Sequence, residues 1–271
     1  MQTKGLFGSG EGVNLTTSPS LSDLAVPFAD EVRSRVERLT ELAAAGGLDE
    51  AISLLTRTVE SGGVIHAFGT GHSEAFSMEL AGRAGGLIPT NKIALRDLVL
   101  YGRLPLDALG GSSLERDAGV VEALWELSPI RDGDVLVVAS NSGVNGSVVG
   151  LALLAKEKGI DVVAVTSMQH TMQVRPKHPS GKRLCDVADV VIDNLAPFGD
   201  ATLTLVGDVP VGAVSSITCA FIAQLLTMGV AERIGGDGQT PPLYLSANIP
   251  GGDEHNHELE KKYEGHIRRG T

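Results

Sequence analysis

Apolar and polar positions fall in blocks along this chain, and the blocks predict strands that alternate with helices. Short apolar runs at 64–68, 134–139, 161–166 and 189–193 have the length and composition of buried parallel strands. A further candidate strand, 87–95, contains Pro89, which favours a place at the edge of a sheet. The pattern therefore predicts an α/β fold, a three-layer α-β-α sandwich around a five-stranded parallel sheet.

Apolar residues at helical spacing fill most of the intervals between these runs. The spacing predicts helices from Phe28 to the Gly46–Gly47 break, over 48–61, from Ser73 to the Gly85–Gly86 pair, over 114–127, from about 146 to 158 and over 211–234. Polar residues such as Thr218 and Gln224 interrupt the last of these, so it indicates a buried helix, of the kind found at subunit interfaces, and not a membrane span.

The ends of the chain and one internal stretch are less regular. Residues 1–22 are polar and rich in Gly, Ser and Thr, which predicts a flexible leader and does not fit a signal peptide. We expect a single domain over 23–271, with a helical insertion at 96–128. A C-terminal arm over 246–271 contains the polar string 251–257, followed by a charged helix. The run 202–208 is extended in character, but the pattern does not place it.

Composition narrows the function. The 271 residues carry a formal net charge of −11, which argues against a nucleic-acid partner but not against one small bound anion. The two cysteines, Cys185 and Cys219, have no metal-ligand spacing and are interpreted as reduced packing thiols. No cofactor motif, metal motif or membrane signal stands out, and a cytoplasmic protein is expected.

The first polar stretch with chemical meaning follows the run 64–68. It reads Gly69-Thr70-Gly71-His72-Ser73 and leads directly into a predicted helix. A strand, a Gly-rich turn and a helix N-terminus direct backbone N–H groups at one point, which suits an anion. Glu74 occupies the third glycine position of a dinucleotide fingerprint, so that motif is excluded. A tight turn without a ligand would have a similar sequence.

A second stretch of the same kind strengthens the ligand hypothesis. The run 134–139 is followed by Ser140-Asn141-Ser142-Gly143-Val144-Asn145 and then by another predicted helix. Two polar strand-to-helix turns in one α/β chain favour a small phosphorylated ligand shared between adjacent strand ends.

The paired loops resemble the sugar isomerase (SIS) domain family, in which an S-x-S-G loop and its following helix hold the phosphate of a sugar phosphate. The resemblance covers roughly residues 28–228 and implies a flavodoxin-like fold that forms a homodimer or a higher homo-oligomer. The ligand-binding residues that it implies are Thr70, Gly71, His72, Ser73, Ser140, Asn141, Ser142, Gly143, Asn145 and Thr166.

Relatives in this family remove the proton at C2 of the sugar, which requires a general base. Glu79 lies in an ELAGR string similar to the ELVGR string of phosphoheptose isomerase, although an ion pair with Arg83 would explain it equally well. Glu115 lies in a string loosely similar to one in N-acetylmuramic acid 6-phosphate etherase; otherwise it is an acid favoured at a helix N-terminus. His255 is a candidate for delivery into a neighbouring subunit's site. Metal binding by His255 and His257 is weakly indicated, and no metal site is assigned.

The resemblance leaves three functions open. Helix 211–234 lacks the histidine that phosphoheptose isomerase carries on its last helix, so an enzyme that acts on an amino-sugar 6-phosphate by C2 proton abstraction and elimination at C3 is favoured. An aldose-ketose phosphosugar isomerase is the alternative within enzymes. A non-catalytic phosphosugar sensor is the alternative outside them.

Overall fold

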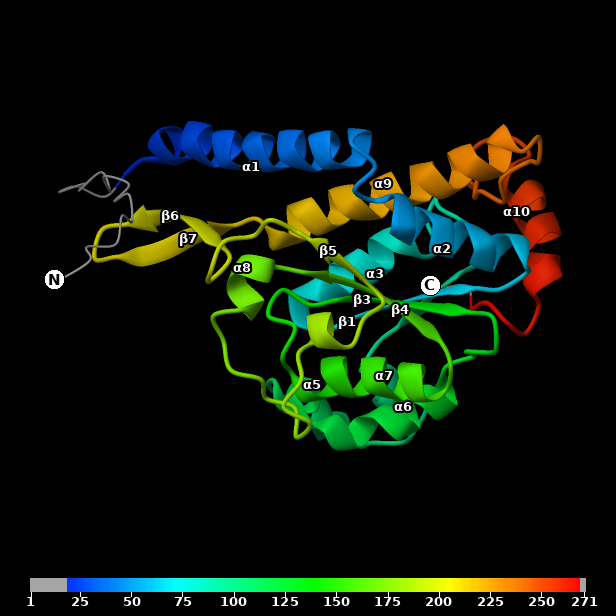
Figure 1. The fold of residues 1–271 in the computed structure, drawn as a ribbon, viewed down its shortest axis with the longest axis horizontal. Coiled ribbons are helices and arrows are strands. Elements are labelled where there is room, and N and C mark those ends of the chain that lie inside the picture. The colour runs from blue at the N-terminus through cyan, green and yellow to red at the C-terminus, as the bar shows by residue number, and fades with distance from the viewer. Residues whose placement is uncertain (1–18, 269–271) are drawn as a thin grey trace, which may run out of the picture.

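A parallel five-stranded sheet forms the centre of the protein, whose computed structural model describes residues 19–268 (Figure 1). The strands are β1 (Ile65–Gly69), β2 (Thr90–Ile93), β3 (Val135–Ala139), β4 (Asp161–Thr166) and β5 (Val190–Asp193), in the order β2-β1-β3-β4-β5. All four pairings between them are parallel. The predicted fold class is therefore confirmed, and β2 lies at an edge, after Pro89 and not across it.

Helices cover both faces of this sheet. On one face lie α2 (Asp49–Glu60), α3 (Glu74–Leu80) and α9 (Ser215–Gly236), and on the other α6 (Val121–Leu127) and α7 (Gly146–Glu157) (Figure 1). Strand residues alternate between the two cores: Ala67 and Val137 belong to the first, Phe68 and Val138 to the second. Because both faces are covered, the strands are continuous apolar runs.

The long helix α1 (Leu21–Ala44) runs above the first face, and Leu39 is its only buried residue. It begins earlier than the expected Phe28, so it includes the last two residues of the predicted leader. Ser20 explains the start, because its backbone N–H and hydroxyl both donate to the carboxylate of Asp23, at 2.9 and 2.6 Å. The rest of the leader, residues 1–18, lies outside the described residues.

The run that the sequence left unplaced forms a two-stranded antiparallel hairpin, β6 (Ala201–Leu205) and β7 (Val209–Ala213). The prediction that a helix begins at Val211 was therefore wrong, since α9 begins at Ser215. Asp200 fixes this start by accepting from the backbone N–H groups of Val214 and Ser215, at 3.2 and 2.8 Å. By length and composition α9 could cross a membrane, but it packs against α1, α2 and α3 as the central helix of its layer.

Three other predicted helices differ in extent. The helix after Ser73 stops at Leu80, with Gly82 at a φ of +74°, well before the Gly85–Gly86 pair. The predicted helix 114–127 is broken at Asp117 into α5 (Ser113–Arg116), a 3₁₀ turn at Ala118–Val120 and α6. The polar string 251–257 does not precede its helix but forms most of it, α10 (Gly252–Glu260).

The remaining elements are single turns. They are α4 (Asp97–Leu100), α8 (Met168–Thr171) and 3₁₀ turns at Gly71–Ser73, Leu106–Leu109, Leu184–Asp186 and Lys261–Tyr263.

Candidate functional site

The two polar loops lie side by side at the carboxyl edge of the sheet. The strand order reverses between β1 and β3, and the last pair of their register joins Gly69 to Ala139. The loop after β1, Thr70–Ser73, and the loop after β3, Ser140–Asn145, therefore leave the sheet from neighbouring strands. In open α/β sheets, ligands bind in the crevice at such a switch point.

The second loop has a conformation that its own residues enforce. Gly143 has a φ of +61°, and its N–H donates to Ser140 Oγ at 3.1 Å. A Cβ at Gly143 would lie 3.0 Å from Thr166 Oγ1, so glycine is needed for both reasons. Ser140 and Thr166 are buried, and their contacts here are with the loop itself. Ser142 makes no side-chain hydrogen bond within the described part of the chain, and its hydroxyl is therefore free for a ligand.

Glu115 joins the two loops. Asn145 Nδ2 donates to Glu115 Oε1, while Glu115 Oε2 lies 3.6 Å from the position that a Cβ of Gly71 would occupy. Asn145 is 8% exposed and its Oδ1 atom is buried without a partner. A ligand hydroxyl or N–H could satisfy this acceptor. The arrangement places a carboxylate, an amide and the N-terminus of α7 around one crevice.

A close backbone approach holds Glu115 in this place. A Cβ on Gly146 would lie 2.1 Å from the carbonyl oxygen of Arg116, so only glycine lets α5 reach the start of α7. Ser147 Oγ also donates to the carbonyl oxygen of Glu115 at 2.9 Å. The break at Asp117 is what turns the chain back towards α7 at this point.

Glu79 and His255 lie in other surroundings. Glu79 Oε1 accepts from Gln224 Nε2 of α9 at 2.6 Å and pairs with Arg83, as the structural interpretation expected. His255 lies on α10, at the opposite end of the sheet from the loops (Figure 1), and its Nε2 atom is 3.1 Å from the carbonyl oxygen of Leu243. Within one chain, therefore, the structure brings Glu115 but not His255 to the loops.

In the first loop, Thr70 is buried whereas Gly71 and His72 are exposed. The loop continues into a 3₁₀ turn at Gly71–Ser73 and then into α3, which has only seven residues. A strong helix dipole is therefore available from the 12-residue α7 and much less from α3.

Comparison with known proteins agrees with this geometry. The profile of the SIS domain matches residues 27–167, slightly more than half of the chain. This chain belongs to the SIS domain family. A UPF0309 protein of Listeria innocua is 38% identical over 219 residues, covering 80% of this chain and 87% of the relative. A UPF0309 protein of Caldanaerobacter subterraneus subsp. tengcongensis is 34% identical over 247 residues, covering 89% and 98%.

Solved structures share the SIS fold. The E. coli CFT073 protein c3406, solved in complex with a sugar phosphate, has a TM-score of 0.51 and 15% identity, covering 80% of this chain and 94% of that one. The phosphoheptose isomerase GmhA of Neisseria gonorrhoeae has a TM-score of 0.47 and 21% identity, covering 79% and 98%.

The sequence reading missed polar residues of this SIS domain that support the second loop from β4 and β5. Asn194 is fully buried after β5, and its Nδ2 donates to Asn141 Oδ1 at 3.2 Å. It also contacts Cys219, a free thiol whose pKa burial raises to about 12, so this cysteine is inert as expected. The available signal was position, since Asn194 follows a strand end as directly as Ser140 does.

His170 was named only as part of a polar loop, yet it lies on α8, next to Thr171, whose Oγ1 would be 3.1 Å from a Cβ of Gly143. Its Nδ1 accepts from the N–H of Gly199 at 2.9 Å, which assigns the proton to Nε2 in the neutral ring. Burial lowers the pKa of His170. The ring also stacks on Phe198, with centroids 5.1 Å apart.

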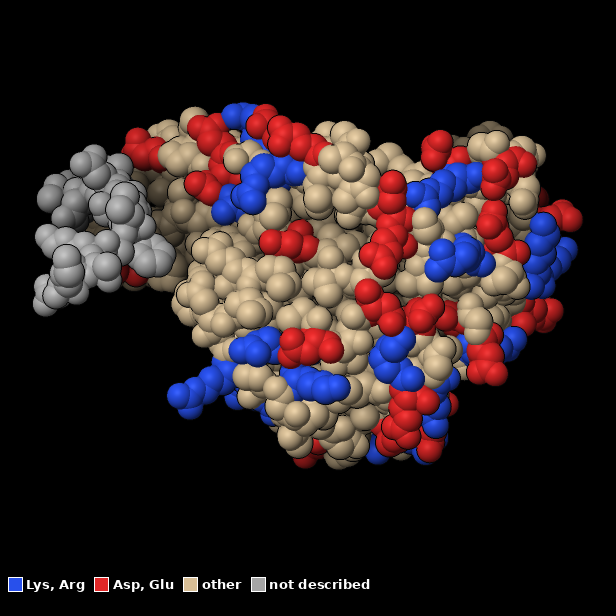
Figure 2. Space-filling model, in the orientation of Figure 1, with Lys and Arg blue, Asp and Glu red and all other residues tan. Residues whose placement is uncertain are grey.

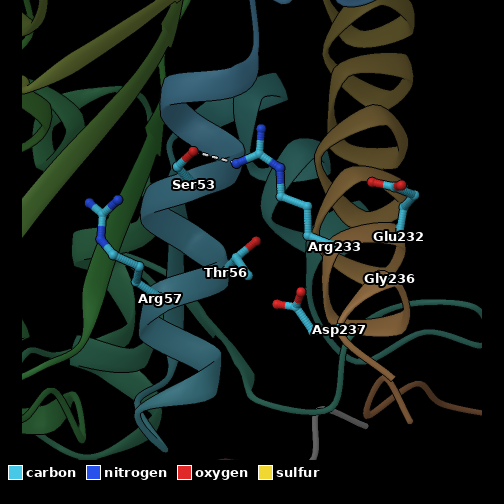
Figure 3. A pocket seen from close by; sticks show the side chains of 7 residues that line it. All are labelled: Ser53, Thr56, Arg57, Glu232, Arg233, Gly236 and Asp237. Atoms are coloured by element: carbon cyan, nitrogen blue, oxygen red, sulfur yellow. Dashed lines mark hydrogen bonds between the residues drawn. The ribbon is translucent and has the colours of Figure 1, made fainter. Parts of the chain in front are cut away.

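A hollow of about 620 Å³ lies elsewhere, between α2 and the C-terminal end of α9 (Figure 3). Ser53, Thr56, Arg57, Glu232, Arg233, Gly236 and Asp237 line it. Arg233 is occupied by Ser53 and by Asp49, and acids and bases are mixed around the rim. None of the predicted site residues lies there, so the crevice between the loops remains the candidate site.

Proposed function

We propose that this SIS protein binds a sugar phosphate between its two polar loops, with the phosphate on Ser140–Asn145 and the N-terminus of α7. The observation that carries the proposal is the convergence of both loops, Glu115 and the unpaired Asn145 Oδ1 at one strand crossover. The first-turn N–H groups of α7 and the free Ser142 hydroxyl supply donors for an anion. The sugar-phosphate complex of the c3406 protein supports the same class of ligand.

For the reaction, we propose elimination on an N-acetylhexosamine 6-phosphate. In the open-chain aldehyde, Glu115 takes the C2 proton, and the C–H electron pair forms an enolate across C1 and C2. The enolate then re-forms the aldehyde and a C2–C3 double bond, while the C3 hydroxyl leaves as water with a proton returned from the same carboxylic acid. An N–H donor near C1, from the loops, would stabilise the enolate.

Two other carboxylate and histidine assignments belong to the proposal. Glu79, held by Gln224, is the alternative base. His255 would act only from a second subunit, since within its own chain it lies at the other end of the sheet. The runner-up reaction is aldose-ketose isomerisation, which returns the proton to C1 of a substrate with a C2 hydroxyl. A sensor would bind the same ligands without turnover.

Proton NMR of the enzyme with N-acetylglucosamine 6-phosphate in deuterated water tests the proposal. We expect loss of the C2 proton signal together with new alkene resonances. Conversion of hexose or heptose phosphates to ketoses, with the amino sugar unchanged, would replace the lyase with the isomerase. Binding of all of them without turnover would leave the sensor. Ser142→Ala should raise the KM for the phosphosugar on the order of tenfold, because one hydrogen bond to a charged phosphate is lost.

We also propose that two copies of the chain pair through α1 and the β6–β7 hairpin. Charged side chains of both signs alternate along α1 (Figure 2), but apolar residues between them are exposed, namely Leu21 at 80% and Val26 at 64%. Val209 on the hairpin is 52% exposed. A second copy would cover these residues. Sedimentation equilibrium should give a dimer or a larger assembly, and a monomer at micromolar concentration would contradict it.

A further inference from the structure

A second cluster of chemically capable side chains lies at the amino edge of the sheet, opposite the loops. His66 is the second residue of β1, Asp134 immediately precedes β3, and His266 belongs to the C-terminal segment after α10. Their residues are 0%, 5% and 8% exposed. One potential ligand atom from each lies within 4.8 Å of the other two. Nothing in the proposed sugar chemistry uses these groups.

One carboxylate oxygen is the centre of the cluster. Asp134 Oδ2 lies 2.9 Å from His66 Nε2, 2.8 Å from His266 Nε2 and 2.8 Å from the backbone nitrogen of Arg131. A carboxylate oxygen has about two lone-pair sites, so three nitrogen donors exceed what it can accept well. The other oxygen, Oδ1, accepts from the N–H of Val64 at 2.8 Å, which fixes the orientation of the carboxylate.

The C-terminal segment brings His266 to this position through backbone contacts. Asn91 of β2 is 1% exposed and uses both ends of its amide: Nδ2 donates to the carbonyl oxygen of His266 at 2.7 Å, and Oδ1 accepts from the N–H of Arg268 at 2.6 Å. The Arg131 guanidinium donates to the carbonyl oxygen of Gly265 at 2.5 Å. The imidazole of His266 is therefore placed without depending on its own hydrogen bond.

We propose that His66, Asp134 and His266 bind one divalent transition-metal ion, which fastens the C-terminal segment to the amino edge of the sheet. Two imidazole nitrogens and a carboxylate oxygen are a donor set that suits Zn²⁺, Co²⁺, Ni²⁺ or Fe²⁺ and not Mg²⁺ or Ca²⁺. The ion replaces the two histidine hydrogen bonds to Oδ2 and leaves those of Arg131 and Val64 in place. The overcrowding at Oδ2 is thereby removed.

The distances fit this exchange without movement of the backbone. Donor atoms 2.8 and 2.9 Å apart subtend an angle of roughly 85° at an ion about 2.1 Å from each, close to the right angle of octahedral ligands. Coordination through Nε2 moves the proton of the His66 ring to Nδ1. That atom is buried and has no partner, so the move breaks no existing hydrogen bond. Water would occupy the remaining positions around the ion.

The two nearby arginines do not occupy the ligand positions. The Arg131 side chain is engaged with Gly265, and the Arg268 guanidinium donates to the carbonyl oxygen of Leu127 and lies over the ring of Tyr101, 5.1 Å from its centroid. The metal-binding nitrogens and oxygen are thus contributed by β1, the start of β3 and the C-terminal segment. The proposal does not rest on the sugar site, which lies at the opposite edge.

Isothermal titration of the tag-free, chelator-treated full chain with ZnCl₂ and with CoCl₂ tests this site. We expect saturable binding of one ion per chain, visible absorption of the Co²⁺ form, and no binding of Mg²⁺. His266→Gln should weaken Zn²⁺ binding at least about 100-fold, because glutamine keeps a hydrogen-bond donor but not an imidazole ligand. The matched control is His257→Gln on α10, which should leave the affinity unchanged.

Two further measurements keep the proposal decisive. Asn91→Ala leaves all three ligands but releases the segment, so it should weaken Zn²⁺ binding while His257→Gln does not. Hydrogen exchange of residues 264–268 should slow when Zn²⁺ is added to the wild-type chain and not to His266→Gln. Absence of one-to-one binding of either ion, or equal affinity in wild type and His266→Gln, would overturn the proposal and leave a purely hydrogen-bonded cluster.

Discussion

Glu115→Gln is expected to lower the turnover number of this SIS protein about 10²- to 10⁴-fold while the phosphosugar Kd changes little. Glutamine has nearly the shape of glutamate but cannot take the C2 proton. Its side-chain oxygen can still accept from Asn145 Nδ2, so the loops should keep their relative position. Turnover measured by NMR and binding measured by calorimetry on the same preparation separate the two effects.

Two variants serve as comparisons for this result. Glu122→Gln, an exposed acid at the start of α6, should behave as the wild type. Glu79→Gln decides between the two carboxylates: if it abolishes turnover while Glu115→Gln remains fully active, Glu79 is the base. Full activity of both variants would contradict C2 proton abstraction by either residue.

Gly146→Ala is expected to destabilise the protein by about 1–3 kcal/mol and to reduce turnover together with stability. The new Cβ would lie 2.1 Å from the carbonyl oxygen of Arg116 and 2.8 Å from the backbone nitrogen of Ala118, and both are backbone atoms that cannot rotate away. The segment that carries Glu115 must then move off α7 and away from Asn145. Urea denaturation measures the change in stability.

The matched control for this prediction is Gly235→Ala in the last turn of α9. The nearest atom to its new Cβ is 3.9 Å away, and alanine is a better helix former than glycine, so a small gain of about 0.5–1 kcal/mol is expected. Equal stability of Gly146→Ala and wild type would show that the close approach of α5 to α7 is not required.

Much of the fold follows from local sequence. The β3 and β4 runs are apolar on both faces, and a polar Ser or Thr stands where each strand ends, so strand limits and the positions of both loops could be predicted. The S-x-S-G pattern also specifies the glycine that the second loop needs, since Gly143 has a positive φ. The limits of helices were less accessible where a single polar residue decided them, as Ser20 with Asp23 does for α1 and Asp200 does for α9.

What only the tertiary structure decided is which of the polar residues meet. Glu115 and Asn145 are 30 residues apart, and His66 and Asp134 are 68 apart, so no periodicity links them. Their meeting depends on strand order, which places β1 beside β3. The sequence by itself determined the strands, the loops and the class of ligand, because these depend on local alternation and turn chemistry. The sheet order and the backbone approach at Gly146 determined the site, because they bring distant segments together.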